Sequence, residues 1–219
     1  MIYEESGCEP VTYVESSVLR CERLSLPASE LYYPRFDGLT QYAVISEPSP
    51  FAISDGIDFE LSLKLMRTSW PGGAFALSSR AGTSYGLNIY LSGNGDDGAG
   101  SIGIFGTSLA AVGFYSNVEY QILVKRVGSL WSLFVNGNVV SEKQTSLAAI
   151  PLVTKSTVAA LDGGTFKMQG FVYDLRLTVG GVLVYDLPMN KKPMAVQLPS
   201  VGSSSATIIN HTEAMWELS

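Results

Sequence analysis

YQILVKRVGSLWSLFVNGNVV, residues 120–140, is the stretch that decides the fold class. Apolar and polar side chains alternate along it with the period of two that is typical of half-buried strands. Gly128-Ser129 and Asn136-Gly137 interrupt this alternation, and both pairs favour two-residue hairpin turns because their residues tolerate a positive φ. The segment therefore predicts three consecutive antiparallel strands with one apolar face that must pack on a second layer.

The alternation continues on either side of this meander. Residues 57–66 predict a long strand with one apolar face, made of Ile57, Phe59, Leu61, Leu63 and Leu65. Residues 170–185 predict a hairpin around Gly180-Gly181, with one apolar face made of Phe171, Tyr173, Leu175, Leu177 and Val179. Because we find neither a convincing amphipathic helix nor an internal repeat, the sequence predicts an all-β protein built from antiparallel sheets.

Length and charge narrow the possible functions. A chain of 219 residues can bury a core without a metal or a disulfide. Its net charge of −6 disfavours nucleic acid and anionic membrane surfaces as partners, because both are bound by clustered Lys and Arg. The sequence has no apolar run of about 18 residues, so we expect no membrane insertion. The acidic first ten residues differ from the basic start of a signal peptide, and we expect an extracellular role to require another route of export, such as an assembled particle.

Residues 1–34 differ in character from the rest of the chain. They contain Cys8 and Cys21, which either form a disulfide or remain two reduced thiols. Together with the single histidine, His211, these cysteines do not make a convincing zinc site. We expect residues 1–34 to be either an arm that docks on a neighbour or extra edge strands of the main domain.

The order of the strand and turn signals resembles the laminin-G-like and pentraxin-like domains of the concanavalin A-like lectin/glucanase superfamily. The resemblance begins at Phe36-Asp37-Gly38 with Tyr42 following, includes the Trp-bearing strand and Asn-Gly turn at 131–137, and ends at the strand 170–177. It covers residues 35–188 and implies a two-sheet antiparallel jelly-roll sandwich. Residues 189–219 follow as a tail that we expect to pack on this domain or on a neighbour.

The tail resembles the segments that follow such domains in bacteriophage tail and other virion proteins, with a Gly/Ser-rich stretch, the strand-like ATIIN and a final Trp216. The resemblance implies a non-enzymatic carbohydrate-recognition or adhesion module of a virion, located in the extracellular particle and bound to host-surface glycan. The alternative is a structural virion protein that contacts other virion proteins. In either case we expect a homo-oligomer.

Catalysis is the least favoured alternative. Glycoside hydrolases of this superfamily place two or three carboxylates on one face of a strand, because retaining hydrolysis needs two carboxyl groups about 5 Å apart. Asp58 and Glu60 share a face, but Ser62 and Lys64 follow where a third carboxylate would stand. We therefore expect the protein not to be an enzyme.

The loop GNGDDGAG, residues 93–100, is the candidate metal site. Asn94, Asp96 and Asp97 supply oxygen donors of the kind that calcium prefers. The same residues also favour turns, so a solvated hairpin tip is the alternative interpretation.

Aromatic residues in loops are the candidate glycan contacts, because aromatic rings cover the C–H faces of sugars while polar groups meet the hydroxyls. The candidates are Trp70, Tyr85, Phe114 and Tyr115. Trp70 is the strongest of them because it lies in the turn SWPGG, although it could equally cap the edge of the sandwich. Trp131 alternates with polar residues on a central strand, and we expect it in the core.

Overall fold

The computed structural model describes residues 30–54, 56–69, 72–81, 84–93, 100–105, 109–145, 150, 155–161 and 164–218. These residues form two eight-stranded antiparallel sheets that pack face to face, and one turn of 3-10 helix, η1 (Glu213–Met215). The prediction of an all-β, two-sheet antiparallel sandwich is confirmed. No helix among the described residues is long and apolar enough to cross a membrane.

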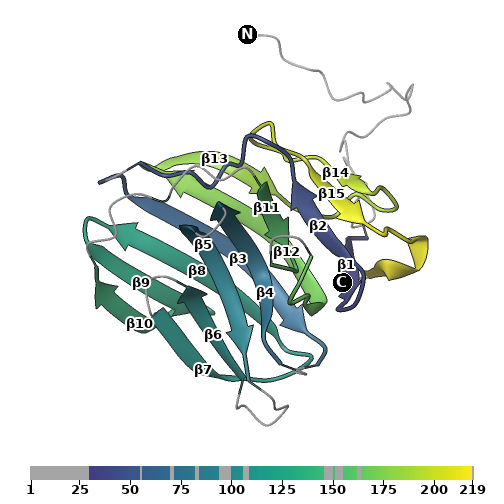
Figure 1. Cartoon of the computed structure of the whole chain (residues 1–219), viewed down its shortest axis with the longest axis horizontal. Coiled ribbons are helices and arrows are strands. Elements are labelled where there is room, and N and C mark those ends of the chain that lie inside the picture. Colours follow the sequence, from purple (N-terminus) through teal and green to yellow (C-terminus); the bar gives the residue numbers. More distant parts are fainter. Residues whose placement is uncertain are drawn as a thin grey trace, which may run out of the picture.

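We call the sheet that contains the predicted meander sheet I. Its strands lie in the order β10 (Asn138–Gln144), β9 (Leu130–Val135), β8 (Glu119–Val127), β3 (Phe59–Arg67), β12 (Gln169–Val179), β1 (Tyr32–Asp37) and β16 (Trp216–Leu218), with β13 (Val182–Leu187) also paired to β12. Figure 1 shows this sheet behind the second one.

Sheet II covers sheet I. Its strands lie in the order β14 (Val196–Gln197), β15 (Ala206–Ile209), β2 (Tyr42–Ile45), β11 (Lys155–Val158), β4 (Ala74–Ala81), β5 (Ser84–Ser92), β6 (Gly100–Phe105) and β7 (Leu109–Phe114). The strands β6, β7, β9 and β10 lie at one side of the molecule, and β14 and β15 lie at the other (Figure 1).

The predicted meander is β8, β9 and β10. Gly128 has a φ of +58° at the first turn, and Asn136 and Gly137 have φ values of +50° and +79° at the second, as two-residue hairpins require. Trp131 is buried in the core, where its ring meets the ring of Phe59 edge to face at 5.2 Å. The core therefore fills the space between the two sheets, as the apolar face of the meander predicts.

The predicted face of β3 is also confirmed. Phe59, Leu61, Leu63 and Leu65 are buried, and only Ile57, which precedes the strand, is exposed. Alternate residues of a strand point to opposite faces, so the polar residues of β3 lie on the outer face of sheet I.

The predicted face of β12 is wrong for Phe171 and Tyr173. Asp174 has a φ of +51°, and the register of β12 against β3 shifts by one residue at this point. Such a β-bulge reverses which side chains face inward. Leu175 and Leu177 therefore face the core, whereas Phe171 and Tyr173 lie on the outer face of sheet I.

The C-terminal segment contributes strands to both sheets. β14 and β15 extend sheet II beyond β2, and β16 pairs with β1 in sheet I. The indole of Trp216 is buried and donates a hydrogen bond to Nε2 of His211 at 3.0 Å. These strands make residues 196–218 an integral part of the sandwich.

The two ends of the sandwich are named after the connections that they hold. We call the end with the β1–β2, β3–β4, β7–β8 and β11–β12 connections, all of which pass from one sheet to the other, the crossover end. Backbone hydrogen bonds from Thr68 to Gln169 and from Asn117 to Arg67 join these connections. We call the opposite end, with the tight β8–β9 and β12–β13 turns, the hairpin end.

Candidate ligand-binding surfaces

At the crossover end, the chain between β11 and β12 is fixed to the edge of β4 by its own backbone. The Ala159 N–H donates to the Ala76 carbonyl at 2.9 Å, and the Phe75 N–H donates to the Phe166 carbonyl at 3.1 Å. The Met168 N–H donates to the Ala159 carbonyl at 2.8 Å. The β11–β12 connection, which we call the crossover, is therefore held in place by β4, and Phe166 is exposed on it.

Phe166 combines an exposed ring with an unusual backbone. Its φ is +47°, a left-handed conformation that is strained for a bulky residue, and 58% of its surface is exposed. The ring lies 6.3 Å from that of Phe75, and Phe75 in turn lies 4.9 Å from Tyr90. Backbone strain of this kind concentrates at functional sites, where the surrounding structure maintains it.

Tyr42 continues this surface on the other side of the crossover. Gly164 has a φ of +73°, and a Cβ added to it would lie 2.8 Å from the Tyr42 ring, so the close contact requires glycine. The ammonium of Lys167 lies 5.7 Å from the centroid of the same ring. We call this set the aromatic surface; it consists of Tyr42, Phe75, Tyr90, Phe166 and Lys167.

The turn that leads into Tyr42 is held by Asp37. Its carboxylate accepts hydrogen bonds from the backbone N–H groups of Leu39, Thr40 and Gln41 at 2.8–2.9 Å, and from the Thr40 hydroxyl at 2.6 Å. Burial alone would raise the pKa of Asp37, but these hydrogen bonds outweigh it and lower the pKa to about 2. The ionised carboxylate therefore stabilises the β1–β2 turn.

The structure separates the aromatic residues that the sequence suggested as glycan contacts. Tyr115, in the β7–β8 connection, is 47% exposed at the crossover end. Phe114 is instead a core residue, 2% exposed and packed on Tyr120, because a bulge at Gly113 turns its side chain inward. Tyr85 lies on β5 opposite Arg80, at the hairpin end.

The other suggested residues lie outside the described part of the chain. They are Trp70, Asn94, Asp96 and Asp97. Within the described ranges, no group of three or more His, Cys, Asp or Glu side chains could hold a metal ion. Calcium binding by residues 93–100 therefore remains a prediction, and so does a contact from Trp70.

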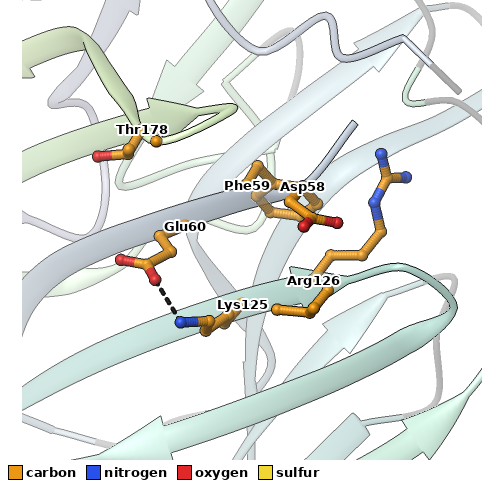
Figure 2. Close-up of a pocket in the computed structure, with 8 residues that line it drawn as sticks. Asp58, Phe59, Glu60, Lys125, Arg126 and Thr178 are labelled. Carbon is orange, nitrogen blue, oxygen red and sulfur yellow. Dashed lines mark ion pairs between the residues drawn. The ribbon is translucent and has the colours of Figure 1, made fainter. Parts of the chain in front are cut away.

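A polar depression of about 310 Å³ lies at the hairpin end, on sheet I (Figure 2). Its lining comprises Asp58, Phe59, Glu60, Lys125, Arg126, Val127, Thr178 and Gly181. Glu60 and Lys125 form an ion pair of 2.6 Å between β3 and β8, and the Arg126 side chain extends away from that pair. The depression is thus a charged site on the sheet, without an exposed aromatic ring in its lining.

Asp58 and Glu60, the carboxylates considered for catalysis, both line this depression, as their shared face predicts. Asp58 Oδ1 accepts a hydrogen bond from the Gly128 N–H at 2.7 Å, and Glu60 pairs with Lys125. Partners within this chain therefore engage both carboxylates.

The centre of the outer face of sheet I holds an aromatic and ionic cluster. Tyr173 stacks on Tyr33 with ring centroids 4.0 Å apart, and its hydroxyl donates to the carboxylate of Glu119. Lys64 pairs with Asp174 at 3.4 Å. Burial, followed by the nearby charge of Asp174, raises the pKa of Tyr33. The cluster joins side chains of β1, β3, β8 and β12 across the outer face of sheet I.

An apolar groove of about 380 Å³ opens between β7 and the β9–β10 hairpin. It is lined by Ala110, Ala111, Val112, Gly113, Phe114, Tyr120, Val135 and Val140. Val112 is 80% exposed beside it, and Val139 and Val140 are also exposed. Large contiguous patches of exposed apolar surface mark contacts with other molecules, so this groove is a candidate contact surface.

The sequence matches no known family model, and no curated protein matches it. Solved structures do match the fold. A candidate carbohydrate-binding protein from Bacteroides ovatus superposes with a TM-score of 0.62 at 9% identity, over 88% of this chain and 61% of that chain. This chain thus spans about three fifths of that protein.

Two animal proteins show the same likeness. The SAP-like pentraxin of Limulus polyphemus matches with a TM-score of 0.50 at 8% identity, over 68% of this chain and 75% of that chain. Mouse laminin alpha1 domains LG4-5 match with a TM-score of 0.50 at 15% identity, over 80% of this chain and 48% of that chain. The chain has the jelly-roll fold of these domains, as the resemblance implied. Identities this low show the fold and do not assign a ligand.

Sequence reasoning did not find the residues of the aromatic surface. Phe166 lies in the Gly-rich segment GGTFKM, which lacks the alternation by which strands are recognised. Its exposure follows from hydrogen bonds to β4, which is distant in the sequence. The one local signal of an exposed aromatic residue was its position between two polar residues, shortly after Gly-Gly.

Proposed function

We propose that the protein is a non-enzymatic carbohydrate-binding module and that the aromatic surface holds the saccharide. The observation that carries this proposal is Phe166, an exposed ring kept in a strained conformation by a crossover fixed to β4. Glycine is the residue that adopts such a φ without steric cost, so a bulky residue at this position is unusual.

The chemistry of the surface suits a sugar ring. The Phe166 ring offers an apolar face to the C–H groups of a pyranose, and Tyr42 offers a ring with a hydroxyl at its edge. The Lys167 ammonium beside Tyr42 can donate hydrogen bonds to ring hydroxyls. Because Phe75 packs beside Phe166, and Tyr90 packs on Phe75, little ordering of side chains accompanies binding.

Two further observations support this assignment. The B. ovatus protein with the same fold is itself a candidate carbohydrate-binding protein. The carboxylate pair considered for hydrolysis lies at the hairpin end, away from the aromatic surface, and its members are engaged by Gly128 and Lys125. We therefore propose binding without turnover.

We further propose that the module belongs to a virion, such as a bacteriophage tail or fibre, and binds host-surface glycan. The support is the resemblance of residues 189–219 to segments of virion proteins. Mass spectrometry of particles purified through a density gradient tests this setting. We expect the chain to copurify with infectious particles, and its confinement to the unassembled fraction would contradict the virion assignment.

Binding of the purified protein to a bacterial-glycan array tests the proposed function. We expect binding to a defined group of glycans with no release of product. Running the array with calcium and with chelator also tests the predicted calcium site at residues 93–100, because loss of binding in chelator would implicate that loop. Absence of binding to every glycan would contradict the carbohydrate proposal.

The apolar groove between β7 and β10 favours a second candidate function, a structural protein that contacts its own copies or other subunits. Val112 is the most exposed apolar residue beside the groove. Light scattering of the wild type and of Val112→Lys tests this role. An oligomer that dissociates in the variant would support a structural role, and a wild-type monomer would contradict self-association through the groove.

A further inference from the structure

We propose that the depression at the hairpin end is a second binding site, which accepts a neutral polyhydroxylated ligand such as a single hexose ring. It shares no residue with the aromatic surface and lies at the other end of the sandwich. The inference therefore stands independently of the function proposed for the crossover end.

The charges that line the depression balance one another. Glu60 and Lys125 form an ion pair at 2.6 Å, and the lining holds one further carboxylate, Asp58, and one further cation, Arg126. The Arg126 guanidinium donates to the carbonyls of Ile57 and Ser54. A site with no net charge gives an ionic ligand no overall attraction, which favours a neutral ligand.

The same groups offer hydrogen-bond donors and acceptors close together. Each carboxylate has two oxygens and about four acceptor positions, so Glu60 and Asp58 keep acceptor capacity beyond the contacts they already make. The Lys125 ammonium has three donors, and the Thr178 hydroxyl can both donate and accept. Adjacent hydroxyls of a sugar need this mixture, because each hydroxyl is also both donor and acceptor.

The depression is held in place before any ligand arrives. Asp58 joins the two turns at its rim, since its Oδ1 accepts from the Gly128 N–H at 2.7 Å and its carbonyl accepts from the Gly180 N–H at 2.8 Å. Beneath it, the Arg126 guanidinium lies over the rings of Phe59 and Trp131, at 5.3 and 5.8 Å from their centroids. Groups fixed in this way lose little conformational freedom on binding.

The volume of the depression and the residues at its rim limit the size and the kind of ligand that it can accept. A volume of about 310 Å³ is at the lower end of the roughly 300–1,000 Å³ typical of small-molecule sites, so one small ring is a suitable occupant. Val127 lines the depression and is 50% exposed, which gives the C–H face of such a ring an apolar contact. The chain would then bind saccharide at both ends and could bridge two glycan chains.

Nuclear magnetic resonance of the ¹⁵N-labelled full chain tests the inference. The probes are D-glucose, D-galactose and D-mannose, with N-acetylneuraminic acid and D-glucosamine as charged comparators. The amides of Gly128, Gly180 and Gly181 report on the depression, and those of Gly164 and Phe166 report on the aromatic surface. We expect at least one neutral sugar to move the first set of resonances, more strongly than either charged sugar does.

Paired variants separate this site from the proposed glycan site. The double variant Glu60→Leu/Lys125→Met replaces the ion pair by apolar side chains of similar size. It should lower the affinity for the neutral sugar, measured from the shifts of Gly128 and Gly181 during titration, by about tenfold. Phe166→Ala should leave those shifts unchanged. The inference would be overturned if no neutral sugar shifted the amides of Gly128, Gly180 and Gly181, or if a charged sugar shifted them more than the neutral sugars do. Equal shifts in the Glu60→Leu/Lys125→Met variant would also overturn it.

Discussion

The crossover end and the hairpin end of the sandwich present two different kinds of surface. The crossover end exposes the ring of Phe166, at a strained φ, on a connection that hydrogen bonds fix to β4. The hairpin end exposes charged side chains on regular strands, joined by turns whose positive φ values fall on glycine. Among the described residues, the first end therefore keeps a bulky side chain at a φ that it does not prefer, whereas the described turns of the second end have glycine at such positions.

This difference is one reason why we propose that ligand binding occurs at the crossover end. At the hairpin end, Gly128, Gly180 and Gly181 have the conformations that tight turns require, so turn geometry explains them. At the crossover end, a phenylalanine occupies a conformation suited to glycine, and turn geometry does not explain that choice. Ligand binding gives a reason for it.

The largest expected effect is on stability at the hairpin end. Trp131→Ala should lower the free energy of unfolding by about 3–5 kcal/mol, because it leaves a cavity beneath Phe59 and Arg126. Urea denaturation followed by circular dichroism measures this loss. Leu130→Ala, at the partly exposed neighbouring position, should lower it by less than about 1 kcal/mol. Similar losses of unfolding free energy in both variants would contradict the role of Trp131 as a core residue that supports the depression.

Two glycines with similar φ compare the ends directly. Gly164→Ala should destabilise the protein by about 2–4 kcal/mol, because it adds a contact with Tyr42 to the cost of a left-handed alanine. Gly181→Ala should cost only about 1–2 kcal/mol, since its Cβ would meet nothing within 4 Å. Equal losses in urea denaturation would mean that the crossover is not closely packed against Tyr42.

The Asp37 carboxylate gives the crossover end a dependence on acid pH. Its folded pKa of about 2 lies below the ordinary value of 3.8, so its stabilisation is present above pH 3.8 and is lost as the pH falls toward 2. Solvent screening limits this contribution to less than about 1 kcal/mol. Urea denaturation between pH 2 and pH 6 should show that the free energy of unfolding falls less with decreasing pH in Asp37→Asn than in the wild type. An identical pH dependence in the two proteins would contradict the role of this turn.

The smallest expected effect on stability is at Phe166, and it distinguishes a functional role of this residue from a structural one. Phe166→Gly should leave the free energy of unfolding unchanged or raise it by at most about 1 kcal/mol, because glycine relieves the strain at φ +47°. The same variant should lose glycan binding on the array. A loss of stability above about 1 kcal/mol would instead assign Phe166 a structural role.

Much of the fold could be predicted from the sequence because the period of two is a local signal. The meander at 120–140 and the apolar face of β3 were predicted correctly for this reason. The outward position of Tyr173 could not be predicted, since it depends on a bulge at Asp174 that only the register against β3 reveals. Phe114 was misplaced for the same physical reason, a bulge at Gly113.

The candidate sites were predictable only in part. The shared face of Asp58 and Glu60 followed from strand periodicity, but their partners Gly128 and Lys125 come from β8 and its turn and depend on the pairing of strands. The aromatic surface was not predicted, because it assembles from β2, β4, β5 and the crossover. Local patterns identify strands, whereas sites between distant segments require the tertiary arrangement.

The most direct test of the account is the affinity of Phe166→Ala for the glycan that the wild type binds best on the array, measured by isothermal titration calorimetry beside Val182→Ala. Val182 is a matched control because it is 64% exposed and lies at the hairpin end. We expect a loss of affinity of at least about tenfold for Phe166→Ala, equivalent to about 1.4 kcal/mol, and no change for Val182→Ala. Unchanged affinity in Phe166→Ala would contradict the assignment of glycan binding to the crossover end.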